Sequence, residues 1–258
     1  MQLNLEGKRV LVTGSSRGIG LAIAGAFLAE EAKVVLTSRK QTDLNRLKKS
    51  LSNYYPPDSI IASACDFTDT KAIADLYNVI TNNWDGLDIL VLNVGNGKSS
   101  AAPVPDGVCF ERTFQLNFEV AVNTTREFYP LLKKSAGNIL FITSIAGVEA
   151  FGAPTDYAAA KSALISFSKN LARKAAADGV RVNCIAPGNI FFEGGVWDTK
   201  IQADPEGIQR VIETTVPMRR FGNPEEIAAA VLFLCSEQSS FTTGTCLIID
   251  GGQTVSII

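Results

Sequence analysis

The chain has 258 residues, 46% of them hydrophobic and 19% charged, so it can bury a substantial core and is not globally disordered. Its 24 basic and 26 acidic side chains give a formal charge of -2, which excludes the positive field that a nucleic-acid partner requires. The absence of histidine excludes a Ser-His-Asp triad and histidine-bearing zinc sites, and we expect no bound metal.

The cysteines and the N-terminal sequence indicate in which cellular compartment the protein is expected. The five cysteines include no C-x-x-C pair, and all but Cys109 lie in or beside apolar or small-residue runs, so we expect buried, reduced thiols. The first residues, MQLNLEGKRVLVTG, lack the basic, apolar and cleavage regions of a signal peptide. No apolar run approaches the roughly 18 residues of a membrane span. We expect a cytoplasmic protein without membrane contact.

Short apolar runs rich in branched residues alternate with longer helical patterns along the chain. Such repeated strand-helix units predict a parallel sheet, and the near-continuous hydrophobicity of the strands favours helices on both faces. The predicted strands are 9–13, 33–37, 60–64, 88–93, 138–143, 181–185 and 245–249. The expected fold class is therefore α/β, a Rossmann fold with a doubly wound, seven-stranded parallel sheet.

A (β/α)8 barrel is the competing architecture, but residues 189–217 interrupt the rhythm of eight regular units. No linker, charge block or repeat divides the chain, so we expect residues 1–258 to form one domain. The segment 189–217 lies late in the chain and carries Phe191, Phe192 and Trp197. Its position and composition predict a substrate lid over a site.

The first predicted strand runs directly into a glycine turn, Gly14-Ser15-Ser16-Arg17-Gly18-Ile19-Gly20, and a helical pattern follows. Glycines at such a turn let the main chain approach a pyrophosphate, whose charge is favoured by the free N–H groups and dipole of the helix start. A purely structural tight turn is the alternative. We predict dinucleotide binding by Gly14, Ser16, Arg17, Gly18, Ile19 and Gly20.

The residues after the second and third strands bear on cofactor choice. The second strand ends at Ser38-Arg39, where an NAD site would offer an acidic side chain to the ribose 2'-hydroxyl. Arg39, together with Arg17, can hold the 2'-phosphate of NADP, so we expect NADP(H) rather than NAD(H), although either arginine is also compatible with a solvated surface charge. Asp66 is predicted at the adenine end, with an N-cap or a turn residue before Thr68-Asp69 as its alternative.

Tyr157 and Lys161 lie four residues apart in a helical stretch and therefore share one face. A nearby ammonium favours the ionised form of a phenol, whose reference pKa is about 10, so the pair suits proton transfer. Ser144 follows the fifth strand, where its hydroxyl can polarise a substrate carbonyl. Taken alone, a Tyr-Lys pair is also compatible with two surface neighbours, and the glycine turn favours the catalytic interpretation.

The glycine turn, Asn117, Ser144 and the Tyr157-x-x-x-Lys161 spacing together resemble the short-chain dehydrogenase/reductase family, and the resemblance covers the whole chain. It implies that Tyr157 is the catalytic acid/base and that Ser144 orients the carbonyl. It also implies that Lys161 lowers the tyrosine pKa and binds the nicotinamide ribose, and that Asn117 holds a water in the proton relay. All four positions of the family's catalytic tetrad are filled.

The resemblance implies further contacts with the cofactor. Asp66 matches the adenine-contacting aspartate of the family, and Pro187-Gly188 matches the turn beside the nicotinamide. The other residues that we expect near the cofactor are Phe67, Asn93, Gly95 and Ile190. Asp250-Gly251-Gly252 matches the closing motif, near which family members often form tetramers, so a homotetramer or homodimer is expected.

Two positions depart from the family pattern. Leu92-Asn93-Val94-Gly95 stands where the family commonly has Asn-Asn-Ala-Gly, so one asparagine is lost and a bulkier side chain is expected near the cofactor. Phe192 occupies the position four residues beyond Gly188, where a threonine often bonds the nicotinamide carboxamide. The carboxamide must then find a main-chain or lid partner.

The 3-oxoacyl-acyl-carrier-protein reductases of this family are the main alternative for the substrate. They tend to carry basic residues before the fifth and sixth strands, where this chain has Lys133-Lys134 and Asp178, and an acid there should repel the acidic carrier. A small polar molecule, such as a sugar derivative, fits the expected substrate loops better, although each polar residue is also compatible with a solvated loop. These residues are Asn96, Lys98, Ser99, Ser100, Glu149, Asn189, Glu193 and Trp197.

The sequence thus predicts an NADP(H)-dependent oxidoreductase that interconverts a ketone and a secondary alcohol by hydride transfer on a small-molecule substrate. Reduction of a 3-oxoacyl group on a carrier protein is the first alternative. A non-catalytic NADP(H)-binding sensor or scaffold is a remote alternative, because its usual sign is a broken tetrad.

Overall fold

The computed structural model describes residues 2–256 and contains a seven-stranded sheet in the order β3-β2-β1-β4-β5-β6-β7. All neighbouring strands pair in parallel. The strands are β1 (Arg9–Val12), β2 (Lys33–Ser38), β3 (Ile60–Ala64), β4 (Ile89–Leu92), β5 (Asn138–Ile142), β6 (Arg181–Pro187) and β7 (Cys246–Ile249). The predicted α/β class and all the predicted strands are confirmed.

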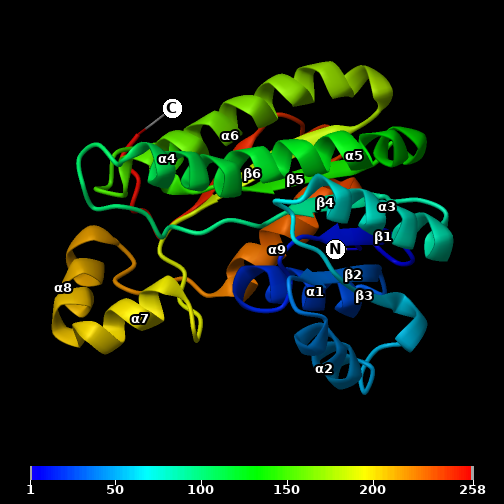
Figure 1. Ribbon diagram of the computed structural model, residues 1–258, viewed down its shortest axis with the longest axis horizontal. Helices are drawn as coiled ribbons and strands as arrows, with labels where there is room; N and C mark the ends of the chain where they lie inside the picture. The colour runs from blue at the N-terminus through cyan, green and yellow to red at the C-terminus, as the bar shows by residue number, and fades with distance from the viewer. Residues whose placement is uncertain (1, 257–258) are drawn as a thin grey trace.

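Helices cover both faces of this sheet (Figure 1). One face packs against α1 (Gly18–Ala29), α2 (Gln41–Leu51) and α9 (Pro224–Cys235). The other packs against α3 (Thr70–Trp84), α5 (Val120–Ser135) and α6 (Thr155–Ala175). Before α5, the chain runs through α4 (Gly107–Phe114) and the π-helix η2 (Gln115–Glu119).

The alternation of side chains along the strands builds two separate cores. Val10 of β1 packs in the first core, which contains Phe27 of α1. Its neighbour Leu11 packs in the second core, which contains Phe128 of α5. All four side chains are fully buried. Successive strand residues point to opposite faces, so a strand covered on both sides must be apolar at every position.

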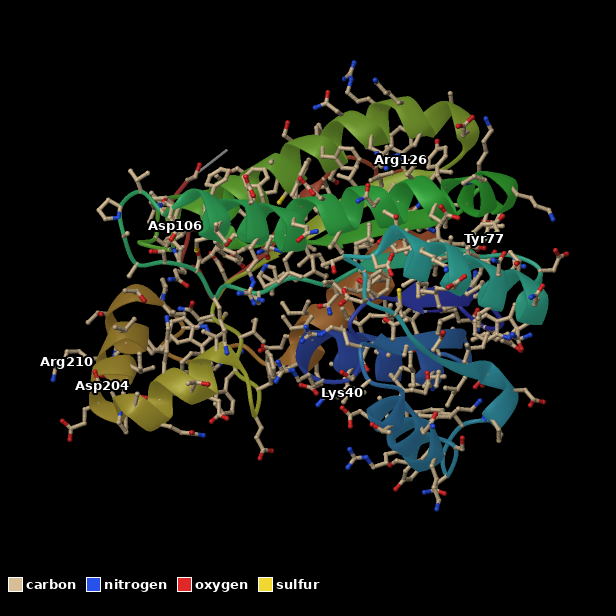
Figure 2. All side chains as sticks on the ribbon, in the orientation of Figure 1. Lys40, Tyr77, Asp106, Arg126, Asp204 and Arg210 are labelled. Carbon is tan, nitrogen blue, oxygen red and sulfur yellow. The ribbon has the colours of Figure 1, made fainter. Side chains whose placement is uncertain are left out.

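The segment 189–217 contains two helices, α7 (Val196–Ala203) and α8 (Pro205–Thr215), at one end of the molecule (Figure 1). Asp204 accepts a hydrogen bond from the Gly207 amide at the start of α8. In Figure 2, Asp204 and Arg210 mark this end, far from Tyr77 on α3. Within these two fully described helices only Ile212 is buried, so they contribute little to the cores.

The described residues also bear on the expected thiols and membrane contact. Cys65, Cys184 and Cys235 are buried free thiols, as expected, whereas Cys246 is partly exposed because β7 is an edge strand. Within residues 2–256, none of the helices combines the length and apolar character required to cross a membrane.

Candidate functional site

The candidate site lies at the carboxyl edge of the sheet. Parallel strands all end at this edge, and the strand order reverses between β1 and β4, where ligands of such sheets bind. The predicted site residues follow the ends of successive strands there. They include Gly14 after β1, Arg39 after β2, Asp66 after β3, Asn93 after β4, Ser144 after β5 and Gly188 after β6.

The glycine turn after β1 has backbone geometry and packing that favour glycine over residues with side chains. Gly14 and Gly18 adopt positive φ of 66° and 56°, which favour glycine. A Cβ atom on Gly20 would lie 2.4 Å from the Gly14 carbonyl oxygen and 2.6 Å from Nδ2 of Asn93. The N-cap residue of α1, Arg17, makes no side-chain capping bond, so the first-turn amides of α1 face outward as donors. This donor set fits a pyrophosphate.

Neighbouring strands brace the turn from both sides. Ser15 Oγ accepts a hydrogen bond from the Thr37 amide at 2.9 Å, and Thr37 Oγ1 accepts one from the Gly14 amide at 2.9 Å. Directly after β4, Asn93 Nδ2 donates to the carbonyls of Thr13 and Gly14 at 3.0 and 3.1 Å. The Asn93 amide group therefore supports the turn, and its contribution to a nucleotide site comes through the shape of that turn.

At the end of β4, the residue that departs from the family pattern, Leu92, packs into the core. Leu92 is buried within the second core, so its side chain does not stand in the site. Val94 is partly buried against the same core, and its Cγ2 atom would lie 3.2 Å from a Cβ on Gly14. The bulkier side chain that touches the turn is therefore Val94.

The residues expected at the adenosine end lie after β2 and β3. Ser38 Oγ donates to the Lys40 carbonyl at 3.1 Å, and Arg39 is exposed. Asp66 Oδ1 accepts from Oγ1 and the amide of Thr68 at 2.7 and 3.0 Å. These bonds, and to a smaller extent the charge of Arg39, lower the pKa of Asp66. The turn role that was the alternative for Asp66 is thus present in the structure.

Two predicted cofactor residues direct their side chains into the cores. Phe67 belongs to the second core and Ile190 to the first, so their contacts at the edge come from main-chain atoms. Pro187 ends β6, and the Gly188 amide donates to the Ile249 carbonyl at 2.9 Å. A Cβ atom on Gly188 would lie 2.7 Å from the Cβ of Asp250. Close packing against the closing motif therefore fixes this turn.

The segment after Gly188 reaches across to the glycine turn. Arg17 donates to the Gly194 carbonyl at 3.0 Å. The ring of Phe192 lies over Gly18, because two of its atoms would be 2.7 Å from a Cβ on that glycine. The predicted Ser16 and Ile19 are half-buried in the same turn. The segment 189–217 and the turn are therefore in direct contact.

Tyr157 and Lys161 lie one turn apart near the start of α6. Burial raises the pKa of Tyr157, and a hydrogen bond with Ser144 acts in the opposite direction. Lys161 is only 3% exposed, and burial lowers its pKa to about 8. Its Nζ atom donates to the Ile142 carbonyl at 3.2 Å and lies 5.8 Å from the centre of the Tyr157 ring. The pKa of Tyr157 is raised overall, because the effect of burial outweighs that of the Ser144 hydrogen bond.

Asn117 is brought to the same place by the π-helix η2, a distortion that frequently occurs at functional sites. Its Nδ2 donates to the Thr113 carbonyl at 3.0 Å, and its Oδ1 accepts from the Asn96 amide at 3.1 Å. A Cβ atom on Gly95 would lie 2.7 Å from Asn117 Oδ1 and 3.1 Å from Lys161 Nζ. Glycine at position 95 thus lets Asn117 and Lys161 converge.

Comparison with known proteins agrees with this geometry. A family model described as enoyl-(acyl carrier protein) reductase matches residues 14–254. The chain is 31% identical to the 3alpha-hydroxysteroid dehydrogenase of Mediterraneibacter gnavus over 97% of this chain and 98% of that protein. It is 30% identical to the 3-oxoacyl-[acyl-carrier-protein] reductase of Thermotoga maritima over 98% of this chain and 100% of that protein. The chain belongs to the short-chain dehydrogenase/reductase family.

A solved structure of another such reductase superimposes closely. The L-sorbose reductase of Gluconobacter frateurii, crystallised with NADPH and L-sorbose, matches with a TM-score of 0.93 and 31% identity over 100% of both chains. The resemblance found in the sequence is confirmed, and the protein is an oxidoreductase of the family that acts on carbonyl and alcohol groups.

In this short-chain dehydrogenase/reductase, two of the polar residues expected to face the substrate form hydrogen bonds within the chain instead. The Glu149 carboxylate accepts hydrogen bonds from the amides of Val255 and Ser256, so it holds the C-terminal segment. Ser99 donates to Asp156. Both groups are engaged within the chain, which leaves fewer of the predicted polar residues to face a substrate.

The sequence did not single out Asp156, although it directly precedes Tyr157 and is only 1% exposed. An acidic residue in the first turn of a helix is an ordinary surface feature, since it complements the helix dipole. Its burial depends on contacts with α4 and the loop after β4, which no local pattern shows.

Proposed function

We propose that the protein is an NADP(H)-dependent oxidoreductase that interconverts a ketone and a secondary alcohol on a small polar substrate. The observation that carries the proposal is the convergence of Asn117, Ser144, Tyr157 and Lys161 at the same sheet edge as the glycine turn. Family membership supports the reaction class.

The chain's residues divide the work of the reaction. Bound NADP(H) supplies or accepts the hydride. Ser144 and Tyr157, which share a hydrogen bond, orient the substrate oxygen, and Tyr157 gives or takes the proton at that oxygen. Lys161 and Asn117 converge beside Gly95 and maintain the supply of that proton.

The turnover test is Tyr157→Phe, which keeps the ring and removes the hydroxyl. We expect kcat to fall by roughly 10²–10⁴-fold, the usual contribution of a general acid, while NADPH affinity changes little. Nicotinamide absorbance with a panel of ketones measures the rate, and fluorescence titration measures binding. Unchanged turnover would refute the assignment, and failure of the wild-type protein to turn over any ketone would favour the non-catalytic sensor.

The preference for NADP(H) is proposed from Arg39 and Arg17, which offer positive charge where a 2'-phosphate would lie. The NADPH-bound sorbose reductase supports it. Arg39→Asp is expected to weaken NADPH binding far more than NADH binding. Arg46→Asp is the control, because Arg46 is an exposed arginine of α2 paired with Asp43. Equal losses for both nucleotides would argue against the 2'-phosphate role.

A small polar substrate is favoured over an acyl-carrier protein by the surface before β5 and β6. Lys133 Nζ lies 2.7 Å from Asp178 Oδ1, and Tyr129 donates to the other Asp178 oxygen at 2.8 Å. The basic charge that a carrier would meet at Lys133 is thus paired within the chain. We expect turnover of sugar-derived ketones above that of a 3-oxoacyl thioester, and the reverse preference would favour the carrier-protein reductase.

We also propose that the protein assembles as a homotetramer or homodimer. Exposed large apolar side chains support this, namely Val104 before α4, Val108 and Phe110 on α4, and Leu247 on β7. Light scattering during size-exclusion chromatography tests it, and a monomer at micromolar concentration would contradict it.

Residues 1–258 are proposed to work as one domain in the reducing cytoplasm, with residues 189–217 as its substrate lid. The contact of the lid with the glycine turn and the five free thiols support these assignments. Limited proteolysis with and without NADPH tests the lid, and cell fractionation tests the location.

A further inference from the structure

A buried carboxylate lies beside the proposed acid/base. Asp156 stands in the first turn of α6, directly before Tyr157, and is only 1% exposed. Its Oδ1 atom accepts a hydrogen bond from the Tyr157 amide at 2.8 Å. A carboxylate this deeply buried requires further partners, because burying an unpaired charge is strongly unfavourable.

Those partners come from two other elements. Ser99, in the loop after β4, donates to Asp156 Oδ2, and Cys109 of α4 places its Sγ atom 3.9 Å from the same oxygen. Thr113 of α4 donates to Ser99 Oγ at 3.3 Å. We call Asp156, Ser99, Cys109 and Thr113 the Asp156 cluster. Figure 1 shows α4 lying alongside the start of α6, and these two helices carry three of the four residues of the cluster.

The cluster continues directly into the proton relay. The Thr113 carbonyl accepts from Asn117 Nδ2 at 3.0 Å, and Asn117 Oδ1 accepts from the Asn96 amide at 3.1 Å. The short loop 96–99 is therefore fixed at both ends, by Asn117 at Asn96 and by Asp156 at Ser99. Burial alone would raise the pKa of Asp156, but hydrogen bonding, above all from Ser99, holds it below its ordinary value.

Building on the proposed function, we propose that Asp156 is a positioning residue that fixes the loop 96–99 and Asn117 relative to Tyr157. Ionised carboxylates accept the strongest hydrogen bonds in proteins, and a single buried acceptor can align hydroxyl donors from separate elements. The loop 96–99 contains part of the expected substrate wall. Asp156 thus sets where the substrate oxygen stands with respect to the Tyr157 hydroxyl.

The test compares Asp156→Asn with Asp106→Asn. Asp106 is the exposed N-cap of α4, where its carboxylate accepts from the Cys109 amide, and asparagine caps helices equally well (Figure 2 labels Asp106). Because misplacement of a reacting group by about 1 Å costs about 10²-fold, we expect Asp156→Asn to lower kcat/KM by about 10- to 100-fold. Rates are expressed per NADPH-binding site, so unfolded protein does not contribute. NADPH affinity is expected to remain within about twofold, and Asp106→Asn is expected to match the wild type.

Two further measurements separate positioning from general stability. Because Ser99→Ala and Asp156→Asn both weaken the Ser99–Asp156 contact, the double variant is expected to lose less than the sum of the two single losses. Hydrogen exchange of the substrate-free protein is expected to be faster in residues 96–106 of Asp156→Asn and unchanged in β1 and α1. Wild-type-like kcat/KM and wild-type exchange in Asp156→Asn would overturn the proposal. A wild-type protein without turnover would instead count against the proposed function, and the exchange result would still decide whether Asp156 fixes the loop.

Discussion

The glycine turn and the lid segment face each other across the candidate site, and they are built in opposite ways. Around the turn, Ser15, Thr37 and Asn93 connect three strands by hydrogen bonds to backbone atoms, and a Cβ on Gly20 would collide with the Gly14 carbonyl. On the lid, α7 and α8 together bury only Ile212 within their described residues.

The two sides meet at two contacts, the Arg17 bond to the Gly194 carbonyl and the ring of Phe192 over Gly18. Backbone geometry thus determines the turn side, and a few side chains determine the position of the lid. Substitutions on the turn side should act through steric exclusion with large effects. Those on the lid side should shift a conformational equilibrium with smaller effects.

Gly20→Ala tests the turn side and should give the largest effect on nucleotide binding. The added Cβ would lie 2.4 Å from a backbone oxygen and 3.1 Å from its carbonyl carbon, so the turn itself must move. We expect the affinity for NADPH to fall by more than about 100-fold, since the amides lose their alignment with the pyrophosphate. Fluorescence titration measures the loss.

Gly25→Ala is the matched control in the same helix, because nothing lies within 4 Å of a Cβ at Gly25. It should leave NADPH binding unchanged and stabilise the protein by about 0.4–1 kcal/mol, as glycine is unfavourable inside a helix. Equal effects of the two changes would show that packing at Gly20 does not limit the turn.

The turn side was predictable from sequence because its signals are local. The strand Arg9–Val12, the glycine spacing and the helical pattern after it are adjacent in the chain. Other features depend on residues distant in sequence. No local pattern indicates the π-helix that presents Asn117, the burial of Asp156, or the use of Glu149 to hold the C-terminal segment.

Replacing Lys161 tests how much the burial of its ammonium group destabilises the folded protein. Burial lowers its pKa to about 8 in the folded chain, from 10.5. Below pH 8 the Lys161 ammonium is charged in the folded and the unfolded protein, and the cost of removing it from water destabilises the folded protein. Above pH 10.5 it is neutral in both, and that cost is absent.

Lys161→Met should therefore raise the free energy of unfolding at pH 7 by at most about 3 kcal/mol, less the cost of leaving the Ile142 carbonyl without its donor, and the gain should shrink as the pH rises towards 10.5. Chemical denaturation at both pH values measures it, and turnover should be lost. Lys169→Met is the control, an exposed lysine of the same helix that donates to the Gly244 carbonyl. A destabilised Lys161→Met protein at pH 7 would show that the ammonium is better accommodated than its burial indicates.

Phe192→Thr tests the lid side and should give the smallest effect. The ring covers Gly18 at the start of α1, so the ring must move before a pyrophosphate can bind these amides. Only molecules with the ring displaced can bind, and the apparent affinity for NADPH is the intrinsic affinity multiplied by their fraction. Removing the ring should tighten NADPH binding by about tenfold or less, equivalent to at most about 1.4 kcal/mol. Phe191→Thr is the control, because the neighbouring Phe191 ring packs against Phe221. Weaker NADPH binding by Phe192→Thr, with Phe191→Thr unchanged, would mean that the ring supports the nucleotide, and the lid would then belong to the cofactor site as much as to the substrate site.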